Sequence, residues 1–454
     1  MATPFPFAVL LGFAWLGVML LFGIFLRAKI GLLQRFLFPS CLVGGLAGLV
    51  ILQTGLLKIE TSLLETISYH LFNISFISIG LIIRSQEEQK AYGGREVLKG
   101  AIWIALVVGV IMPMQAIIGG SLVLIFNFLD FNLFKTLGFL VPLGFNQGPG
   151  QVLSVGKVWE TLGFANAATI GLTFATIGFL FAFFVGVPLA NWGARRGMAE
   201  HTPKSMPAEI LVGIAPKGTR LEPAGRLTMH SGNVDTLAYH FALVGLVYLL
   251  TYALIYQIAG LLRPELAATL WGFFFFVGLL VAIAVRTVII RMGYGHTLDP
   301  GVQRRITGWS VDFLILATVM AVQPAIVWQY MLPIGTISLL VGVLTTLVIV
   351  YLGNRLWTLN IERMVGVYGI CTGTASSGLL LVRVVDPGFR TSASMEIGFQ
   401  AVFSSVPVIS CMLLVSAPLI WNWSMGLTLA VFFGLMVVSV ALLKFLKFWG
   451  KKRF

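Results

Sequence analysis

Two short Gly-rich segments carry the residues of this very apolar chain that are best suited to bind a solute. Residues 144–151 read GFNQGPGQ, and residues 369–378 read GICTGTASSG. Glycine permits positive φ angles and Pro149 removes a backbone donor, so both segments are predicted to interrupt helices. An interruption exposes N–H groups at a helix N-terminus, which suit a carboxylate, and carbonyl oxygens, which suit the hard cation Na⁺.

The candidate binding residues come from both segments and supply side-chain oxygens or a flexible backbone. They are Asn146, Gln147, Gly148, Gly150, Gln151 and Ser154 in the first segment, and Thr372, Gly373, Thr374, Ser376 and Ser377 in the second. These loop oxygens would hold Na⁺ as a coupling ion, and no metal-ligand cluster or organic cofactor is predicted. If the two segments meet near the middle of a bilayer, they form one site for an anion and a cation. The alternative is that the small residues only allow helices to pack closely.

Two acidic residues within predicted membrane spans are further candidates, because an ionisable group in a span is costly and usually functional. Asp312 is expected near the inner end of a span at 308–329, and Glu396 near the inner end of a span at 392–417. Either carboxylate could meet a substrate ammonium or a coupling ion. Alternatively, either could extend toward the nearby arginines Arg304, Arg305 and Arg390.

The composition identifies a multi-pass membrane protein in contact with lipid. The chain is 58% hydrophobic and 10% charged, with a mean hydropathy of +0.95, whereas a soluble domain has about 25% charged residues. The net charge of +13 is explained by Lys and Arg in cytoplasmic loops, so it does not indicate a nucleic-acid partner.

Eleven spans are predicted from apolar stretches of about 20 residues. They are 6–26, 36–57, 67–83, 101–128, 164–192, 237–261, 266–285, 308–329, 334–353, 392–417 and 425–446.

The distribution of basic residues predicts the orientation and the character of the two interrupted stretches. If 134–160 and 361–388 are re-entrant hairpins and the N-terminus is outside, 26 of the 30 Lys and Arg residues fall in inside loops. A full span at either stretch would reverse every later loop and remove this asymmetry. The C-terminus, with Lys451, Lys452 and Arg453, is then cytoplasmic.

The predicted fold class is an all-α membrane protein with an inverted-topology repeat of two five-helix units, each with a re-entrant hairpin. Residues 1–192 form the first unit, 193–236 a cytoplasmic linker, 237–417 the second unit, and 418–454 an extra C-terminal span with a basic tail. A shift of 225 residues aligns the two Gly-rich segments. It matches Gly144, Gly148, Gly163, Phe164, Ala168 and Phe174 with Gly369, Gly373, Gly388, Phe389, Ala393 and Phe399.

The Gly-rich segments, residues 163–169 (GFANAAT) and residues 175–178 (ATIG) resemble the bacterial sodium:glutamate symporter family. The resemblance covers most of residues 6–417 and is strongest at about 140–180. It implies ten core spans, two re-entrant loops, a homodimer in the bacterial inner membrane, and Na⁺-driven uptake of glutamate by elevator-like motion. Residues 146–150 depart from the family's pattern, and neither Gly-rich segment has an Arg for the second carboxylate of glutamate.

The sequence therefore predicts a secondary active transporter, a Na⁺-coupled symporter of a small carboxylate such as glutamate or a related amino acid. A carrier for another organic anion, with H⁺ in place of Na⁺, is the alternative within this class. An ion channel is a further alternative, although channels usually place their filter on an oligomeric axis. A membrane enzyme is not predicted, because neither Gly-rich segment contains Asp, Glu or His.

Overall fold

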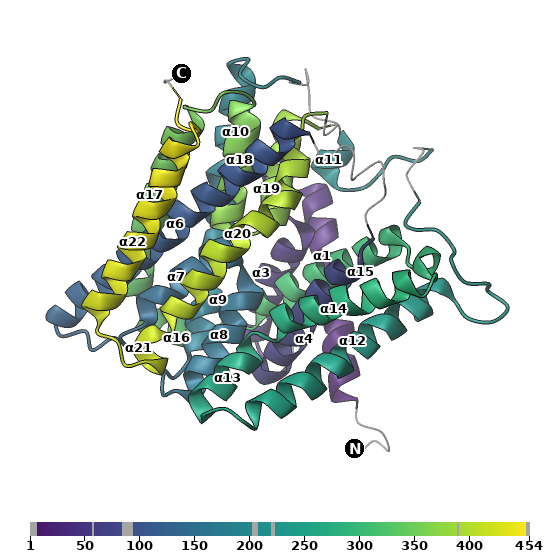
Figure 1. The fold of residues 1–454 in the computed structure, drawn as a ribbon, viewed down its shortest axis with the longest axis horizontal. Helices are drawn as coiled ribbons and strands as arrows, with labels where there is room; N and C mark the ends of the chain where they lie inside the picture. The colour runs from purple at the N-terminus through teal and green to yellow at the C-terminus, as the bar shows by residue number, and fades with distance from the viewer. Residues whose placement is uncertain are drawn as a thin grey trace.

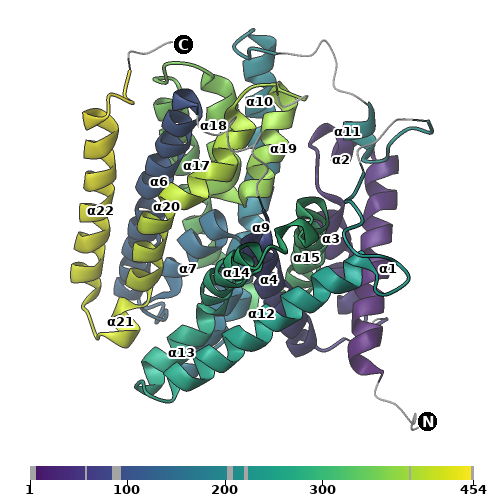
Figure 2. The same cartoon turned by 45° about the vertical axis from the view of Figure 1, so that its right-hand side comes forward.

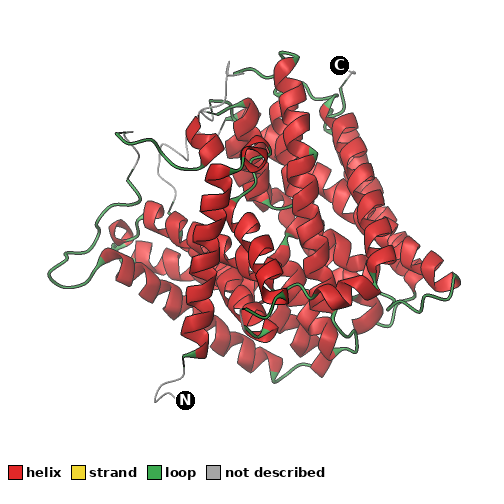
Figure 3. Ribbon diagram, turned by 180° about the vertical axis from the view of Figure 1, so that it is seen from behind, coloured by secondary structure: helices red, strands yellow, loops and turns green. Residues whose placement is uncertain are grey.

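The computed structural model describes residues 7–56, 59–83, 94–201, 208–218, 223–387 and 390–450. These residues form helices and connecting loops, with no strand among them (Figures 1 and 3). Several residues used in the sequence predictions lie outside the described ranges: Lys58, Arg84, Lys90, Lys204, Arg220, Gly388, Phe389, Lys451, Lys452 and Arg453.

Eight of the described helical segments are long and apolar enough to cross a membrane, which makes the chain a multi-pass membrane protein. They overlap eight of the eleven predicted spans, although the predicted bounds 266–285 were wrong for the helix at Phe274–Arg291, because the chain leaves the helical conformation at Phe273 after a shorter helix at Pro264–Gly272. They are α1 (Ala8–Lys29), α6 (Arg95–Phe128), α9 (Ala167–Phe184) continued by α10 (Gly186–Arg195), α12 (Thr236–Ala259), α14 (Phe274–Arg291), α17 (Met331–Gly353), α20 (Ala393–Val415) and α22 (Met425–Phe445).

Helices also occupy the three other predicted spans, but they are shorter or less apolar. They are α3 (Ser40–Gln53), α4 (Thr61–Leu81) and α15 (Pro300–Met320). The predicted bounds 308–329 were wrong for α15, which begins eight residues earlier. The Asp299 carboxylate caps it by accepting the Val302 N–H at 2.8 Å, and Pro300 occupies its first turn. Hydropathy missed this start because the first turns contain Gln303, Arg304 and Arg305.

The remaining elements are short. They are α2 (Gly31–Arg35), η1 (Leu137–Phe139), α7 (Leu140–Pro142), η2 (Leu143–Gln147), α8 (Pro149–Thr161), α11 (Ala208–Val212), α13 (Pro264–Gly272), η3 (Gly295–Thr297), α16 (Pro324–Gln329), α18 (Asn360–Thr372), α19 (Ala375–Val385) and α21 (Ala417–Ile420).

The apolar helices and the interrupted segments occupy different places in the molecule. α1 and α22 stand on opposite flanks, and α18 and α19 lie between them (Figure 2). Exposed leucine, valine and phenylalanine side chains cover α1, α12, α17 and α22. By contrast, residues 136–146 and all of α18 are buried. Irregular backbone at membrane depth requires such shielding by protein, because lipid offers no hydrogen-bond partner.

The final helix, α22, packs against α6 and extends the flank of the molecule (Figure 2). The two helices come close at Gly109, where a β-carbon would lie 2.8 Å from the Ser439 hydroxyl. In the predicted linker 193–236, α11 packs against α1, and the Leu211 carbonyl accepts a hydrogen bond of 3.4 Å from Arg27 Nε.

Candidate functional site

The first interruption falls at Gly148, between a π-helical turn and a new helix. The turn η2 ends at Gln147, Gly148 has φ +82° and ψ −178°, and α8 begins at Pro149. This backbone conformation is essentially confined to glycine. Proline favours the first turn of a helix because its missing N–H would have no intrahelical partner there. The Gly-Pro pair therefore determines where the chain stops one helix and starts the next.

The second interruption falls at Gly373 and Thr374. α18 ends at Thr372, and Thr374 has an extended backbone with φ −148° and ψ 172°. The Thr374 hydroxyl then accepts a hydrogen bond of 3.4 Å from the Ser377 N–H and so caps the N-terminus of α19.

The two interruptions lie against each other. A β-carbon at Gly148 would be 2.7 Å from Thr374 Cγ2, which is too close for any side chain. Gly178 of α9 touches both segments, since its β-carbon would lie 2.8 Å from the Thr372 carbonyl oxygen and 3.3 Å from Phe145 Cα. We call this contact between Gly148, Gly178, Gly373 and Thr374 the glycine junction.

A buried side chain of α6 holds the second interruption in place. Gln115 Nε2 donates to the Cys371 carbonyl at 3.0 Å and to the Thr345 hydroxyl of α17 at 3.2 Å. Gln115 is 0% exposed. One amide group therefore ties α6, α17 and the last turn of α18 together directly before the break.

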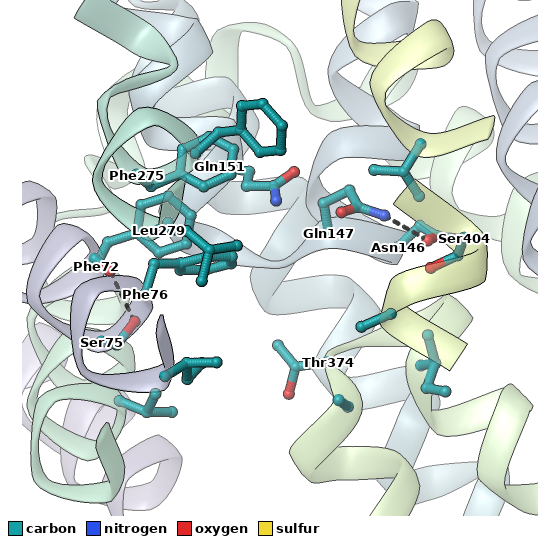
Figure 4. A pocket seen from close by; sticks show the side chains of 18 of the residues that line it. Phe72, Ser75, Phe76, Asn146, Gln147, Gln151, Phe275, Leu279, Thr374 and Ser404 are labelled. Carbon is teal, nitrogen blue, oxygen red and sulfur yellow. Dashed lines mark hydrogen bonds between the residues drawn. The ribbon is translucent and has the colours of Figure 1, made fainter. Parts of the chain in front are cut away.

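A cavity of about 360 Å³ opens beside the glycine junction (Figure 4). One wall is polar and comes from the two interruptions and α20. Its polar side chains are Asn146, Gln147, Gln151, Thr374, Ser376, Gln400, Ser404 and Ser405.

The opposite wall is mainly aromatic and comes from α4 and α14. In Figure 4, Phe72, Phe76, Phe275 and Leu279 face Asn146 and Gln147 across the cavity. The ring centroids of Phe72, Phe76 and Phe275 lie 4.9 to 5.0 Å from one another, so the three rings form one packed cluster. Thr307 and Ser75 add two hydroxyl groups on this side.

No ionised side chain lines this cavity in the described part of the chain, yet several buried polar atoms there have no partner. They are the Asn146 amide nitrogen and the amide oxygens of Gln151 and Gln400. These side chains are only 3%, 5% and 6% exposed. An unpaired buried polar group is costly, so the arrangement favours a ligand that satisfies both donors and acceptors.

The predicted binding residues separate into two groups. Six line the cavity: Asn146, Gln147, Gly150, Gln151, Thr374 and Ser376. The other five shape the backbone instead: Gly148, Ser154, Thr372, Gly373 and Ser377. Of these, the Ser154 hydroxyl donates to the Gly150 carbonyl at 2.9 Å, and the Thr372 hydroxyl donates to the Tyr368 carbonyl at 2.7 Å.

The two acidic candidates lie outside the cavity lining. Asp312 is exposed. It lies in the middle of α15 and not near its start, because that helix begins earlier than predicted. Glu396 is fully buried and accepts two hydrogen bonds of 2.7 Å from Arg363. Its partner is therefore not one of the three arginines proposed from the sequence. Arg363 itself is 1% exposed, although the sequence placed it in a cytoplasmic loop.

Sequence reasoning missed the aromatic wall and the contribution of α20. With 35 phenylalanines in the chain, nothing distinguished Phe72, Phe76 and Phe275 from lipid-facing rings. Gln400 did carry a signal, since an amide within an apolar span needs a hydrogen-bond partner. The prediction overlooked it because only ionisable residues were considered within spans.

A charged pair joins α8 to α4. Lys157 Nζ lies 2.6 Å from Glu65 Oε2 and 2.9 Å from Glu160 Oε2. Burial raises the pKa of the Glu65 carboxyl group, and Lys157 partly opposes this shift. Lys157 thus connects α8, which follows the first interruption, to α4, a helix of the aromatic wall.

Two comparisons with known proteins give no relative for this chain. No protein-family model matches it, and no curated protein is significantly similar to it.

Proposed function

We propose that this protein is a secondary active transporter that imports a small carboxylate together with Na⁺. The observation that carries the proposal is the start of two helices, α8 and α19, at the glycine junction beside an uncharged, partly buried cavity. Glutamate or a related amino acid is the substrate class implied by the resemblance to sodium:glutamate symporters.

The helix starts favour an anion. The first N–H groups of a helix have no intrahelical partner, and each N-terminus is equivalent to about half a positive charge. α8 receives no side-chain cap at Gly148, so its first N–H groups stay available. The unpaired Asn146 amide nitrogen adds a donor beside them. A carboxylate in the cavity would meet these donors without repulsion from an acidic lining residue.

The helix ends at the same junction favour a cation. The last carbonyl groups of η2 and α18 point away from intrahelical donors, as at every helix C-terminus. With the hydroxyl oxygens of Thr374 and Ser376 they offer the hard oxygen ligands that Na⁺ prefers. Co-transport follows if the anion and Na⁺ stabilise the same states of the protein.

Packing of the helices supports the proposed inverted repeat. Gly45 of α3 packs against Leu316 and Val319 of α15, and Gly278 of α14 packs against Ile77 of α4. α3 and α4 belong to the first proposed unit and α14 and α15 to the second. Each unit therefore packs two of its helices against two helices of the other. We propose that each unit contributes one re-entrant hairpin and that the hairpins move as a body against the aromatic wall.

The remaining parts of the proposal follow from the distribution of basic residues and from the resemblance. The N-terminus is outside, the C-terminus is cytoplasmic, and the protein is a homodimer in the bacterial inner membrane.

Uptake into proteoliposomes tests the transport function. We expect saturable accumulation of a labelled small carboxylate when Na⁺ is outside, and none when K⁺ replaces Na⁺. A pH gradient that drives uptake without Na⁺ would instead identify an H⁺-coupled carrier. Ohmic current without saturation would identify a channel and contradict the proposal.

A further inference from the structure

We infer that the substrate is a zwitterionic amino acid with an uncharged, apolar side chain, and not a dicarboxylate such as glutamate. This inference rests on the proposed function, because it names the ligand of the same cavity.

The absence of basic side chains from the described lining of the cavity limits the charge that the ligand can carry. Glutamate brings two carboxylates and one ammonium group. The helix starts at the glycine junction can accept one carboxylate, but no Lys, Arg or His lies among the described lining residues to receive the second. A buried carboxylate without a cationic partner is strongly unfavourable. The proposed Na⁺ and the helix starts can serve the first carboxylate, but a second carboxylate would meet no cationic side chain. The cavity is therefore suited to a ligand with a single carboxylate.

The unpaired amide groups match the two ends of an amino-acid backbone. The Asn146 amide nitrogen is a donor for the carboxylate, because the Asn146 amide oxygen already accepts a hydrogen bond of 2.9 Å from Gln147. The amide oxygens of Gln151 and Gln400 are acceptors for an ammonium group. All three atoms are buried without partners, so binding satisfies groups that are otherwise unpaired.

The aromatic wall matches the side chain. Phe72, Phe76 and Phe275 lie across the cavity from Asn146, and Gln151 lies beside Phe275 (Figure 4). A volume of about 360 Å³ is near the lower limit of small-molecule sites, roughly 300–1,000 Å³. It fits one amino acid whose backbone meets the polar wall and whose apolar side chain packs against the rings.

Uptake of a panel of labelled compounds under an inward Na⁺ gradient distinguishes failure of this inference from failure of the proposed function. We expect Na⁺-driven uptake of L-phenylalanine or L-leucine into proteoliposomes that is not reduced by excess L-glutamate. Na⁺-driven uptake of L-glutamate alone would overturn the inference and leave the proposed function standing. No Na⁺-driven uptake of any of the three would overturn both.

Deaminated analogues test the assignment of the ammonium acceptors. Wild-type protein is expected to prefer L-phenylalanine to 3-phenylpropionate by at least about tenfold in competition, because only the amino acid satisfies Gln151 and Gln400. Gln400→Met keeps the volume but removes the acceptor, so this preference should fall several-fold. Gln257→Met, an exposed position on α12, is the matched control and should keep it.

The preference is a ratio measured within one protein sample, so a lower yield of folded variant does not alter it. An unchanged ratio in both Gln400→Met and Gln151→Met would refute the role of the amide oxygens. For the aromatic wall, Phe275→Ala should weaken L-phenylalanine binding more than L-alanine binding. Phe433→Ala on the exposed face of α22 should weaken neither, and equal weakening by both variants would refute the role of the wall.

Discussion

Single residues determine where the helices break and how tightly the two breaks meet. At Gly148 the backbone has φ +82° and ψ −178°, and the missing side chain leaves space for Thr374. The glycine-proline pair made this break predictable from the sequence. The two segments were expected to meet, but the sequence did not specify which residues would touch, because Gly148 and Thr374 are 226 residues apart in the chain.

We expect Gly148→Ala to abolish most uptake, because it adds backbone strain of about 1–3 kcal/mol and a clash with Thr374. Gly163→Ala is the matched control, since Gly163 also has a positive φ of +96° but no atom within 4 Å of an added β-carbon. Uptake per folded protein measures the difference. Adding Thr374→Ser, which removes Cγ2, should restore part of the lost uptake, and equal activity of the two alanine variants would contradict the role of the junction.

The buried pair Arg363–Glu396 makes a second prediction at this scale. Glu396→Gln leaves the Arg363 guanidinium buried without a full charge partner, and we expect a loss of stability of up to about 3–5 kcal/mol. Thermal or denaturant unfolding in detergent measures it. The control Glu96→Gln disrupts an exposed pair, where Glu96 lies 3.1 Å from Lys99, and should change stability by less than about 1 kcal/mol. A Glu396→Gln protein as stable as this control would show that the pair does not hold α18 against α20.

Among the elements, the predicted span was accurate for α22 but not for α14, although both helices expose apolar side chains, because the predicted span of α14 also took in α13. The predicted and observed bounds of α22 agree to one residue because both sides of that helix are apolar. The bounds of α15 differed because its first turns contain the polar residues Gln303, Arg304 and Arg305, so hydropathy gave no signal there. The arrangement of α4 and α14 around the cavity could not be predicted, since it depends on packing between distant segments.

The pair Lys157–Glu65, which joins α8 to α4, predicts a pH-dependent stability in a variant. Lys157→Met removes the cation that opposes the raised pKa of Glu65. The folded-state pKa of this carboxyl then rises further above its unfolded value. Stability contributed by such a group is present at low pH and is lost as pH rises through the shifted pKa. Lys157→Met should therefore lose more stability relative to wild type at about pH 8 than at about pH 5.

Unfolding of this variant at both pH values measures the effect. The exposed Lys99→Met variant should show no such pH dependence, and the double variant Glu65→Gln with Lys157→Met should lose it. A difference from wild type that is the same at both pH values would show that Glu65 is not destabilised by losing Lys157.

For the whole molecule, the orientation in the membrane can be tested by labelling introduced cysteines. The native Cys41, Cys371 and Cys411 are all buried, so they should add little background labelling. We expect a cysteine introduced at the exposed Thr161, the last residue of α8, to react with an impermeant thiol reagent from outside. A cysteine at the exposed Arg291, at the end of α14, should react only after the membrane is opened. Labelling of both positions from the same side in intact cells would contradict the proposed topology.

The two walls of the cavity come from different elements of the chain. The phenyl rings come from α4 and α14, whereas the hydrogen-bonding groups come from the interruptions and α20. In the proposed carrier, replacing rings on one side is expected to change which substrate is accepted and to leave the proposed Na⁺ ligands on the other side in place. Single substitutions in the aromatic wall of such a carrier can therefore alter its substrate specificity without changing the residues proposed to bind the coupling ion.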